Sequence, residues 1–359
     1  MAQKITHWLL ISLILSLGFG QLFRFESLGF TIYLHDLLVS IILLLNLKDL
    51  KKITLPLGLK IFLVGLSLSW LNALFLYPLN SLLIPFLYSL RLLAYLTLYL
   101  IIKQGSYLPK LAFFQLSGAI MIVIGLVQYF FLPDMRWAQY LGWDDHLSRL
   151  TLPHFDPTFT GTMLVLALLS TQEFSAKLTI SLLSLSGYVL TILLTYARSV
   201  YLSLALTLFL VIKQKIILLI CLGIMFICVL TLPKRFGEGT NLLRTYSIAS
   251  RFTSDLDYVN KYRFQLVIGR GLNTLPLDMT DSRYPNHATG PNNSYLYLLA
   301  TTGLLGLIGW GIWLKHLYQA SSFKPMLTFF LIASLFNNVM FYSFTLLWVL
   351  LIESSDIMS

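Results

Sequence analysis

The sequence predicts an all-α, polytopic membrane protein with eleven or twelve transmembrane helices. Apolar residues make up 57% of its 359 residues and charged residues only 11%, and the mean hydropathy is +0.79. A soluble domain of this length does not need so much apolar surface. The apolar residues also form repeated runs close to the roughly 20 residues that a helix needs to cross a bilayer. We therefore expect residues 1–359 to form a single integral membrane domain.

Eleven apolar runs mark the expected spans. The first run follows Lys4 and resembles the apolar region of a signal peptide, but another span follows at once, so we interpret it as a retained helix. The last run is interrupted by Asn337-Asn338 and Tyr342-Ser343, so it is either one kinked helix or two short ones. The expected spans are 8–23, 30–47, 57–77, 82–102, 111–132, 158–172, 178–195, 198–212, 216–232, 293–314 and 326–352.

Lysine and arginine are distributed differently between the loops. Alternate short loops contain lysine, and the opposite short loops near 78–81 and 195–197 contain none, which places the N-terminus in the cytoplasm by the positive-inside rule. Most of the +10 net charge is this lysine bias, so it does not indicate nucleic-acid binding. The acidic C-terminal segment 353–356 mildly favours an outer C-terminus. The lysines on the cytoplasmic side are Lys4, Lys48, Lys51, Lys52, Lys60, Lys103, Lys110, Lys177, Lys213, Lys215, Lys315 and Lys324.

Arginine lies on the opposite side of the expected membrane or inside a span. Its planar fork suits phosphate and carboxylate groups. Six arginines fall in the long polar loop 233–292, between the spans near 216–232 and 293–314, together with other charges that leave the loop a net charge of +3. A loop of this length is more often functional than accidental, and a cationic lid would attract an anionic headgroup. For any single arginine there, the alternative is a solvated residue with a local ion pair. The six are Arg235, Arg244, Arg251, Arg263, Arg270 and Arg283.

Two arginines are placed unusually within the expected spans. Arg91 lies in the middle of a span, where a charge costs several kcal/mol unless it is paired or hydrated. It is either functional or a structural partner of an acid such as Asp36. Arg198 begins a span at its outer boundary, where a cation opposes the helix dipole. Arg198 and the first-turn N–H groups of that helix would together form an anion site.

Other candidate residues precede helix starts. His287 is a possible general base near the membrane surface. Asn292 and Asn293 come directly before a span, where a helix cap is the alternative to a functional role. Asp156-Pro157 follows Arg149 and opens the sixth span, as expected of a helix start. Gly303 and Gly306 should allow close packing between helices.

The sequence has no motif for a nucleotide, a metal or another cofactor. The histidines, cysteines and acids have no metal-ligand spacing, and Gly269-Arg270-Gly271 is too short for a nucleotide fingerprint. With the polar residues gathered outside, the energy for a reaction must already be stored in the substrate.

Five short segments occur in a consistent order between residues 149 and 315. Together with the arrangement of spans and loops, they resemble the O-antigen ligase and O-antigen polymerase superfamily of bacterial envelope glycosyltransferases. The loop position of Arg251 is also similar to that of an arginine of the family. The segments are His154-Phe-Asp156-Pro157-Thr158, Thr195-Tyr-Ala-Arg198-Ser199, Ile268-Gly269-Arg270-Gly271-Leu272-Asn273-Thr274-Leu275, Asn292-Asn293-Ser294 and Gly303-Leu-Leu-Gly306.

The resemblance implies a GT-C-like fold in the bacterial cytoplasmic membrane. It implies an undecaprenyl-diphosphate-linked glycan donor, used at the outer face with inversion and without metal. Arg198 and Arg251 would hold the diphosphate, and Arg91 would assist from within the cavity. Further substrate-binding residues would be Arg149, Asp156, Arg270 and Asn293. The acceptor would be a glycan or a lipid-linked glycan, and a chain-length regulator is an expected partner.

The chain departs from the family at one informative position. Ligases of the family activate the acceptor with a histidine in the His-Asn pair, but here Asn292 stands in that position and His287 is the nearest histidine. We therefore expect a polymerase rather than a lipid A-core ligase. A flippase for a lipid-linked glycan is the alternative, but it would need anion-binding groups on the cytoplasmic side, where no arginine is expected. A membrane scaffold would leave Arg91 and the loop 233–292 unexplained.

Overall fold

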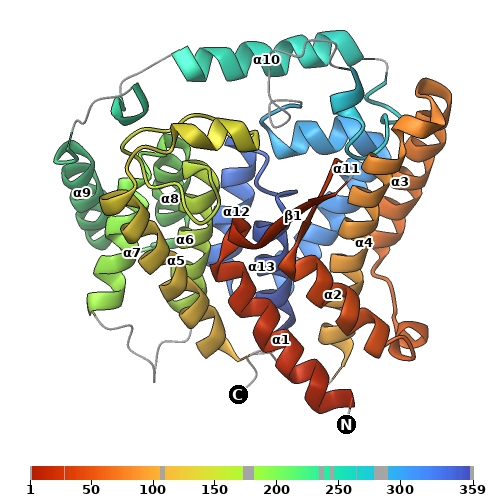
Figure 1. Ribbon diagram of the computed structural model, residues 1–359, viewed down its shortest axis with the longest axis horizontal. Coiled ribbons are helices and arrows are strands. Elements are labelled where there is room, and N and C mark those ends of the chain that lie inside the picture. Colours follow the sequence, from red (N-terminus) through yellow and green to blue (C-terminus); the bar gives the residue numbers. More distant parts are fainter. Residues whose placement is uncertain are drawn as a thin grey trace.

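The structure, a computed structural model, describes residues 2–27, 29–105, 110–172, 182–233, 238–242, 246–263, 265–278 and 290–355. These residues are mostly helical, with one short hairpin of β1 (Arg24–Ser27) and β2 (Phe30–Tyr33) (Figure 1). The α-helices are α1 (Ala2–Gly18), α2 (Leu34–Leu45), α3 (Leu57–Leu76), α4 (Leu83–Gln104), α5 (Leu111–Phe131), α6 (Pro157–Gln172), α7 (Leu182–Leu194), α8 (Arg198–Val211), α9 (Lys215–Leu230), α10 (Tyr246–Tyr262), α11 (Ser294–Ala320), α12 (Lys324–Phe336) and α13 (Ser343–Ser354).

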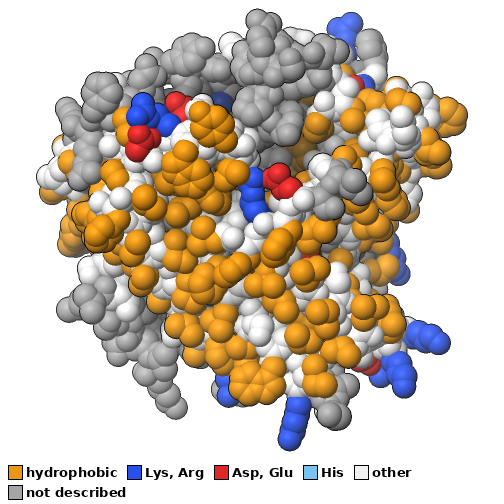
Figure 2. All heavy atoms as spheres, viewed as in Figure 1, with side chains coloured by type: hydrophobic (Ala, Val, Ile, Leu, Met, Phe, Trp, Pro, Cys, Tyr) orange, Lys and Arg blue, Asp and Glu red, His pale blue; other side chains and the backbone are white. Residues whose placement is uncertain are grey.

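The all-α prediction is confirmed, and the chain is a membrane protein by its helices. Four of the described helices, α3, α4, α5 and α11, are long and apolar enough to cross a membrane, and seven shorter helices are also apolar. A broad belt of hydrophobic side chains covers the middle of the face in Figure 2. Large apolar residues are strongly exposed: Phe75 is 88% exposed, Phe131 78% and Ile216 75%. A surface of this kind requires lipid around it.

Two of the expected spans differ from the observed elements. The span expected from residue 30 begins as strand β2, because the aromatic and β-branched residues 30–33 pair with β1 and Gly29 makes the turn at a φ of +79°. Helix α2 starts only at Leu34, where Asp36 accepts the N–H of Tyr33. The run 326–352 is not one kinked helix but the two helices α12 and α13.

The break between α12 and α13 also sets the direction of α13 and therefore the position of its last residues. The Lys103 ammonium donates to the carbonyl of Glu353, and the Ser321 hydroxyl donates to its carboxylate at 2.7 Å. The end of α13 therefore lies at the lysine-bearing end of the molecule, and Figure 1 shows both termini at the end away from α10. The acidic segment 353–356 favoured an outer C-terminus, whereas the structure places the end of α13 beside Lys103; the side of the membrane that this end faces stays a prediction.

Glycines bring α3 and α11 into close contact. A Cβ atom on Gly65 would collide with the backbone of Gly306, and one on Gly309 would collide with the backbone of Phe62. The expected packing role of Gly306 is thereby confirmed.

Gly303 has a different role, because it interrupts α11 at a φ of +72°. The segment 267–271 fills this interruption and pairs with the open helix backbone. The Arg270 N–H donates to the Ala300 carbonyl at 3.1 Å, the Gly271 N–H to Thr301 at 2.9 Å, and the Leu304 N–H to Val267 at 3.0 Å. The break in α11 is thus the place where the extended segment after α10 is anchored.

The Gly303→Ala substitution should therefore destabilise the protein strongly. A methyl group at this position would lie 2.6 Å from the Val267 carbonyl oxygen and would force an L-residue into a left-handed conformation. We expect a loss of about 2–5 kcal/mol, seen as a clear fall in the melting temperature of the detergent-purified protein. Gly311→Ala is the matched control in the same helix, because nothing lies within 4 Å of its Cβ position. Equal melting temperatures for the two variants would contradict the anchoring role.

Candidate functional site

The side chain of Asn337, in the break between α12 and α13, connects several helices at the α10 end of the molecule. Its Oδ1 accepts a hydrogen bond from Arg251 of α10 at 2.9 Å, and its Nδ2 donates to the Ser199 hydroxyl of α8 at 2.9 Å. Its carbonyl accepts from the Ser294 hydroxyl of α11 at 3.0 Å. We call Asn337 and these three partners the Asn337 junction. It joins the beginnings of α8 and α11, the end of α12 and the helix α10 that lies across them (Figure 1).

Arg251 is the exposed member of the Asn337 junction. One N–H group of its guanidinium binds Asn337, and the residue as a whole is exposed. Because a guanidinium has five N–H donors in one plane, this hydrogen bond orients the fork and still leaves donors for a ligand. Arg251 is thus both positioned and accessible.

Arg198 is half-buried at the first residue of α8, directly before Ser199. Its Nη1 donates to the Leu242 carbonyl at 3.3 Å. The first-turn N–H groups of a helix have no partner inside the helix, and the dipole is positive there. The structure therefore places Arg251 and this helix start on two sides of one amide group, although their sequence positions are far apart.

The beginning of α11 forms another side of this region. Asn293 caps the helix, because its Oδ1 accepts the N–H groups of Tyr295 and Leu296 at 2.8 and 3.1 Å. The N–H of Asn292 donates to Asp255 of α10 at 3.1 Å. Burial raises the pKa of the Asp255 carboxyl, although this hydrogen bond and the charge of Arg251 lower it. The capping alternative for Asn293 is confirmed, and Asn292 fastens α10 through its backbone.

His287, together with Arg235, Arg244 and Arg283, lies outside the described residues. Its expected role as a general base stays a prediction.

Arg149 holds the turn that leads into α8. Its Nε donates to the Thr195 carbonyl at 3.0 Å and its Nη2 to the Tyr196 carbonyl at 3.2 Å, and the side chain is buried. Tyr196 adopts a φ of +50°, so these bonds support a strained turn. This geometry favours a structural role for Arg149 over the substrate-binding role expected from the sequence.

Asp156 and Arg270 are also engaged within the protein. Asp156 caps α6, because its Oδ1 accepts the N–H groups of Thr158 and Phe159. Arg270 is buried and forms an ion pair with Asp278 at 2.7 Å, and it donates to the Tyr77 hydroxyl from two nitrogen atoms. Both residues shape the ends of helices and loops, and neither takes part in the Asn337 junction.

Arg91 is paired as in the structural alternative. Its Nη2 lies 2.8 Å from Asp36 Oδ2, and Tyr95 donates to the other carboxylate oxygen of Asp36. Arg91 also binds the Thr31 carbonyl and stacks over the Phe30 and Tyr88 rings. The cavity beside it measures about 60 Å³, which holds a few water molecules but not a diphosphate.

Sequence reasoning missed Asn337 and Asp255 as members of this region. Asn337 was visible only as an interruption of an apolar run, and Asp255 only as one of several loop acids. A polar pair inside an apolar run is the signal that could have marked Asn337, since a buried amide needs partners.

None of the family models compared with the chain matches it, and the curated proteins searched include no significant relative.

Proposed function

We propose that the protein is a membrane glycosyltransferase that uses a glycan on a lipid diphosphate as donor and polymerises glycan units. The observation that carries this proposal is the Asn337 junction, which orients an exposed arginine, Arg251, against the start of α8 with Arg198. A diphosphate is a dianionic group with oxygen atoms that suit bidentate guanidinium binding and helix N–H groups. The absence of a nucleotide motif in the sequence agrees with a donor that carries its own leaving group.

The proposed reaction is a displacement at the anomeric carbon. A hydroxyl oxygen of the acceptor glycan forms a bond to this carbon while the bond from the carbon to the diphosphate oxygen breaks. Negative charge grows on the leaving diphosphate, and Arg251, Arg198 and the first turn of α8 are placed to stabilise it. The hydroxyl proton passes to a base, for which His287 is the candidate from the sequence. The bacterial cytoplasmic membrane, an outer-facing site and a partner chain-length regulator belong to the same proposal.

The test is turnover by the purified protein with undecaprenyl-diphosphate-linked repeat units. A ladder of products indicates a polymerase, and a single transfer to a lipid-linked or core acceptor indicates a ligase. If the donor crosses a vesicle bilayer and no covalent product forms, the protein is a flippase and the proposal is wrong.

Asn337→Ala should reduce product formation by about 10- to 100-fold, because removing the amide releases Arg251 from α8 and leaves Ser199 without this partner. The loss of a hydrogen bond to a charged group is worth about 1.5–3 kcal/mol. The variant is compared with Asn46→Ala, which removes an equally buried asparagine between α1 and α2. Product yields should be normalised to folded protein. If Asn337→Ala forms as much product per folded protein as Asn46→Ala does, the Asn337 junction does not serve catalysis.

A further inference from the structure

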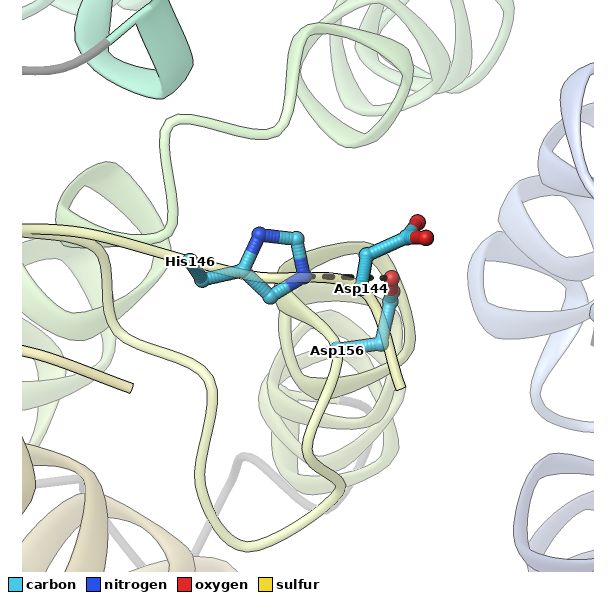
Figure 3. Close-up of side chains that lie close together, drawn as sticks. All are labelled: Asp144, His146 and Asp156. Atoms are coloured by element: carbon cyan, nitrogen blue, oxygen red, sulfur yellow. Dashed lines mark ion pairs between the residues drawn. The ribbon is translucent and has the colours of Figure 1, made fainter. Parts of the chain in front are cut away.

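A second polar cluster lies in the segment before α6, apart from the Asn337 junction. It contains Asp144, His146 and Asp156, whose nearest oxygen and nitrogen atoms lie within 4.8 Å of one another (Figure 3). The spacing along the chain gave no sign of it, because Asp156 comes ten residues after His146. The fold brings them together through backbone pairing: the Met135 N–H donates to the His146 carbonyl at 2.8 Å, and Asp134 forms a bridge with Leu147.

His146 has a buried nitrogen atom directed into this cluster. The residue is 8% exposed, and among the described residues its Nε2 has no hydrogen-bond partner. Figure 3 shows the ring with Nε2 facing Asp156, and the distance to Asp156 Oδ2 is 3.9 Å. This distance is too long for a hydrogen bond. A buried nitrogen left without a partner costs free energy, so a ligand in this position would stabilise the fold.

The two carboxylate oxygen atoms of Asp156 have different neighbours. Its Oδ1 caps α6, whereas its Oδ2 faces the imidazole. The cap fixes the carboxylate and leaves one oxygen atom for a ligand. Asp144 completes the set from an exposed position.

We propose that Asp144, His146 and Asp156 bind a divalent transition-metal ion of the Zn²⁺ type. Bonds from Zn²⁺ to nitrogen and carboxylate oxygen are about 2.0–2.2 Å long, so at the tetrahedral angle that Zn²⁺ prefers two ligand atoms lie about 3.3–3.6 Å apart. The 3.9 Å pair has to close by a few tenths of an ångström, and a shift of about 1 Å by Asp144 brings in the third ligand. An imidazole ligand suits Zn²⁺ and related ions, whereas Ca²⁺ and Mg²⁺ prefer oxygen ligands only.

The charges around the cluster agree with this assignment. Arg149 directs its guanidinium to the carbonyls of Thr195 and Tyr196. The carboxylates of Asp144 and Asp156 supply the negative charge that a cation needs. The ion would fasten the segment 133–156 to the start of α6 and thereby hold Arg149 against the turn into α8.

Zinc titration of the purified, metal-free protein tests this proposal. Wild type should bind one Zn²⁺ per chain by elemental analysis after dialysis, and its melting temperature should rise. Asp144→Asn should bind Zn²⁺ at least about 10-fold more weakly and lose the rise, because it removes a ligand from an exposed position without affecting the core. Asp145→Asn removes the same charge one residue away, outside the cluster, and should behave as wild type.

His146→Gln provides a second variant, which should also lose the zinc-dependent rise in melting temperature. The proposal is overturned if wild type binds no Zn²⁺, or if Asp144→Asn binds it as tightly as Asp145→Asn does. It is also overturned if Ca²⁺ binds as tightly as Zn²⁺, because the imidazole would then not be a ligand. None of these measurements depends on glycan transfer, so they stand or fall separately from the proposed function.

Discussion

Arg251→Lys and Arg198→Lys should each reduce polymer formation by about 10- to 100-fold. A lysine keeps the positive charge, and at position 251 it can still donate one hydrogen bond to Asn337, so the fold should survive. It cannot present two parallel N–H groups to a phosphate. Charge-assisted hydrogen bonds are worth about 1.5–3 kcal/mol each, which sets the size of the expected loss. The measurement is the rate of product formation from lipid-linked repeat units, together with the melting temperature of each variant.

Arg136→Lys is the matched control for these two variants. Arg136 is an exposed arginine that forms a 2.6 Å ion pair with Asp134, outside the Asn337 junction. The same chemical change there should leave the rate within about twofold of wild type, because water and salt screen an exposed ion pair. Polymer of normal amount and length from both Arg251→Lys and Arg198→Lys would exclude the two residues as diphosphate ligands.

Asp36→Ala should destabilise the protein by about 3–5 kcal/mol, which is the usual cost of leaving one member of a buried ion pair without its partner. The Arg91 side chain is 8% exposed and that of Asp36 is 14% exposed, so water cannot replace the missing carboxylate. Asp36 also accepts from the Tyr33 N–H at the start of α2 and from the Tyr95 hydroxyl. The result should be a large fall in the melting temperature of the purified protein.

The double variant Asp36→Leu/Arg91→Met distinguishes pairing from catalysis at this site. Since replacement of a buried pair by apolar residues is often neutral, the double variant should recover most of the stability lost by Asp36→Ala. Activity that returns with stability would assign Arg91 to the fold alone. A stable double variant without activity would instead return Arg91 to the functional role considered from the sequence.

The sequence was sufficient for the fold class because hydropathy acts locally. A run of about 20 apolar residues has few alternatives to a membrane helix, since a bilayer leaves no water for an unpaired backbone. The runs that became α3, α4, α5 and α11 are of this kind. Where the signal was weaker, the expectation failed: residues 30–33 pair as a strand with residues 24–27, and this pairing partner cannot be read from an apolar run.

The candidate site was only partly accessible from the sequence. Arg198 and Arg251 could be selected one at a time by their placement, but not their common neighbour Asn337. The roles of Arg149 and Arg91 depended on backbone carbonyls and a carboxylate that lie far away in the chain, and Arg270 binds the distant Tyr77 as well as the nearby Asp278. An arginine has the same local sequence signal whether it meets a ligand or a neighbour, because its partner is chosen by the fold.

The sequence by itself determined that this chain is a helical membrane protein and that Gly306 lies in a close helix contact. These properties follow from composition and from spacing along a single helix. Only the tertiary structure decided that the last apolar run turns back at Asn337, that the segment 267–271 fills the break at Gly303 and that Asp144, His146 and Asp156 meet. Each of these depends on hydrogen bonds or contacts between distant segments, for which the free energy is gained only when the whole chain is folded.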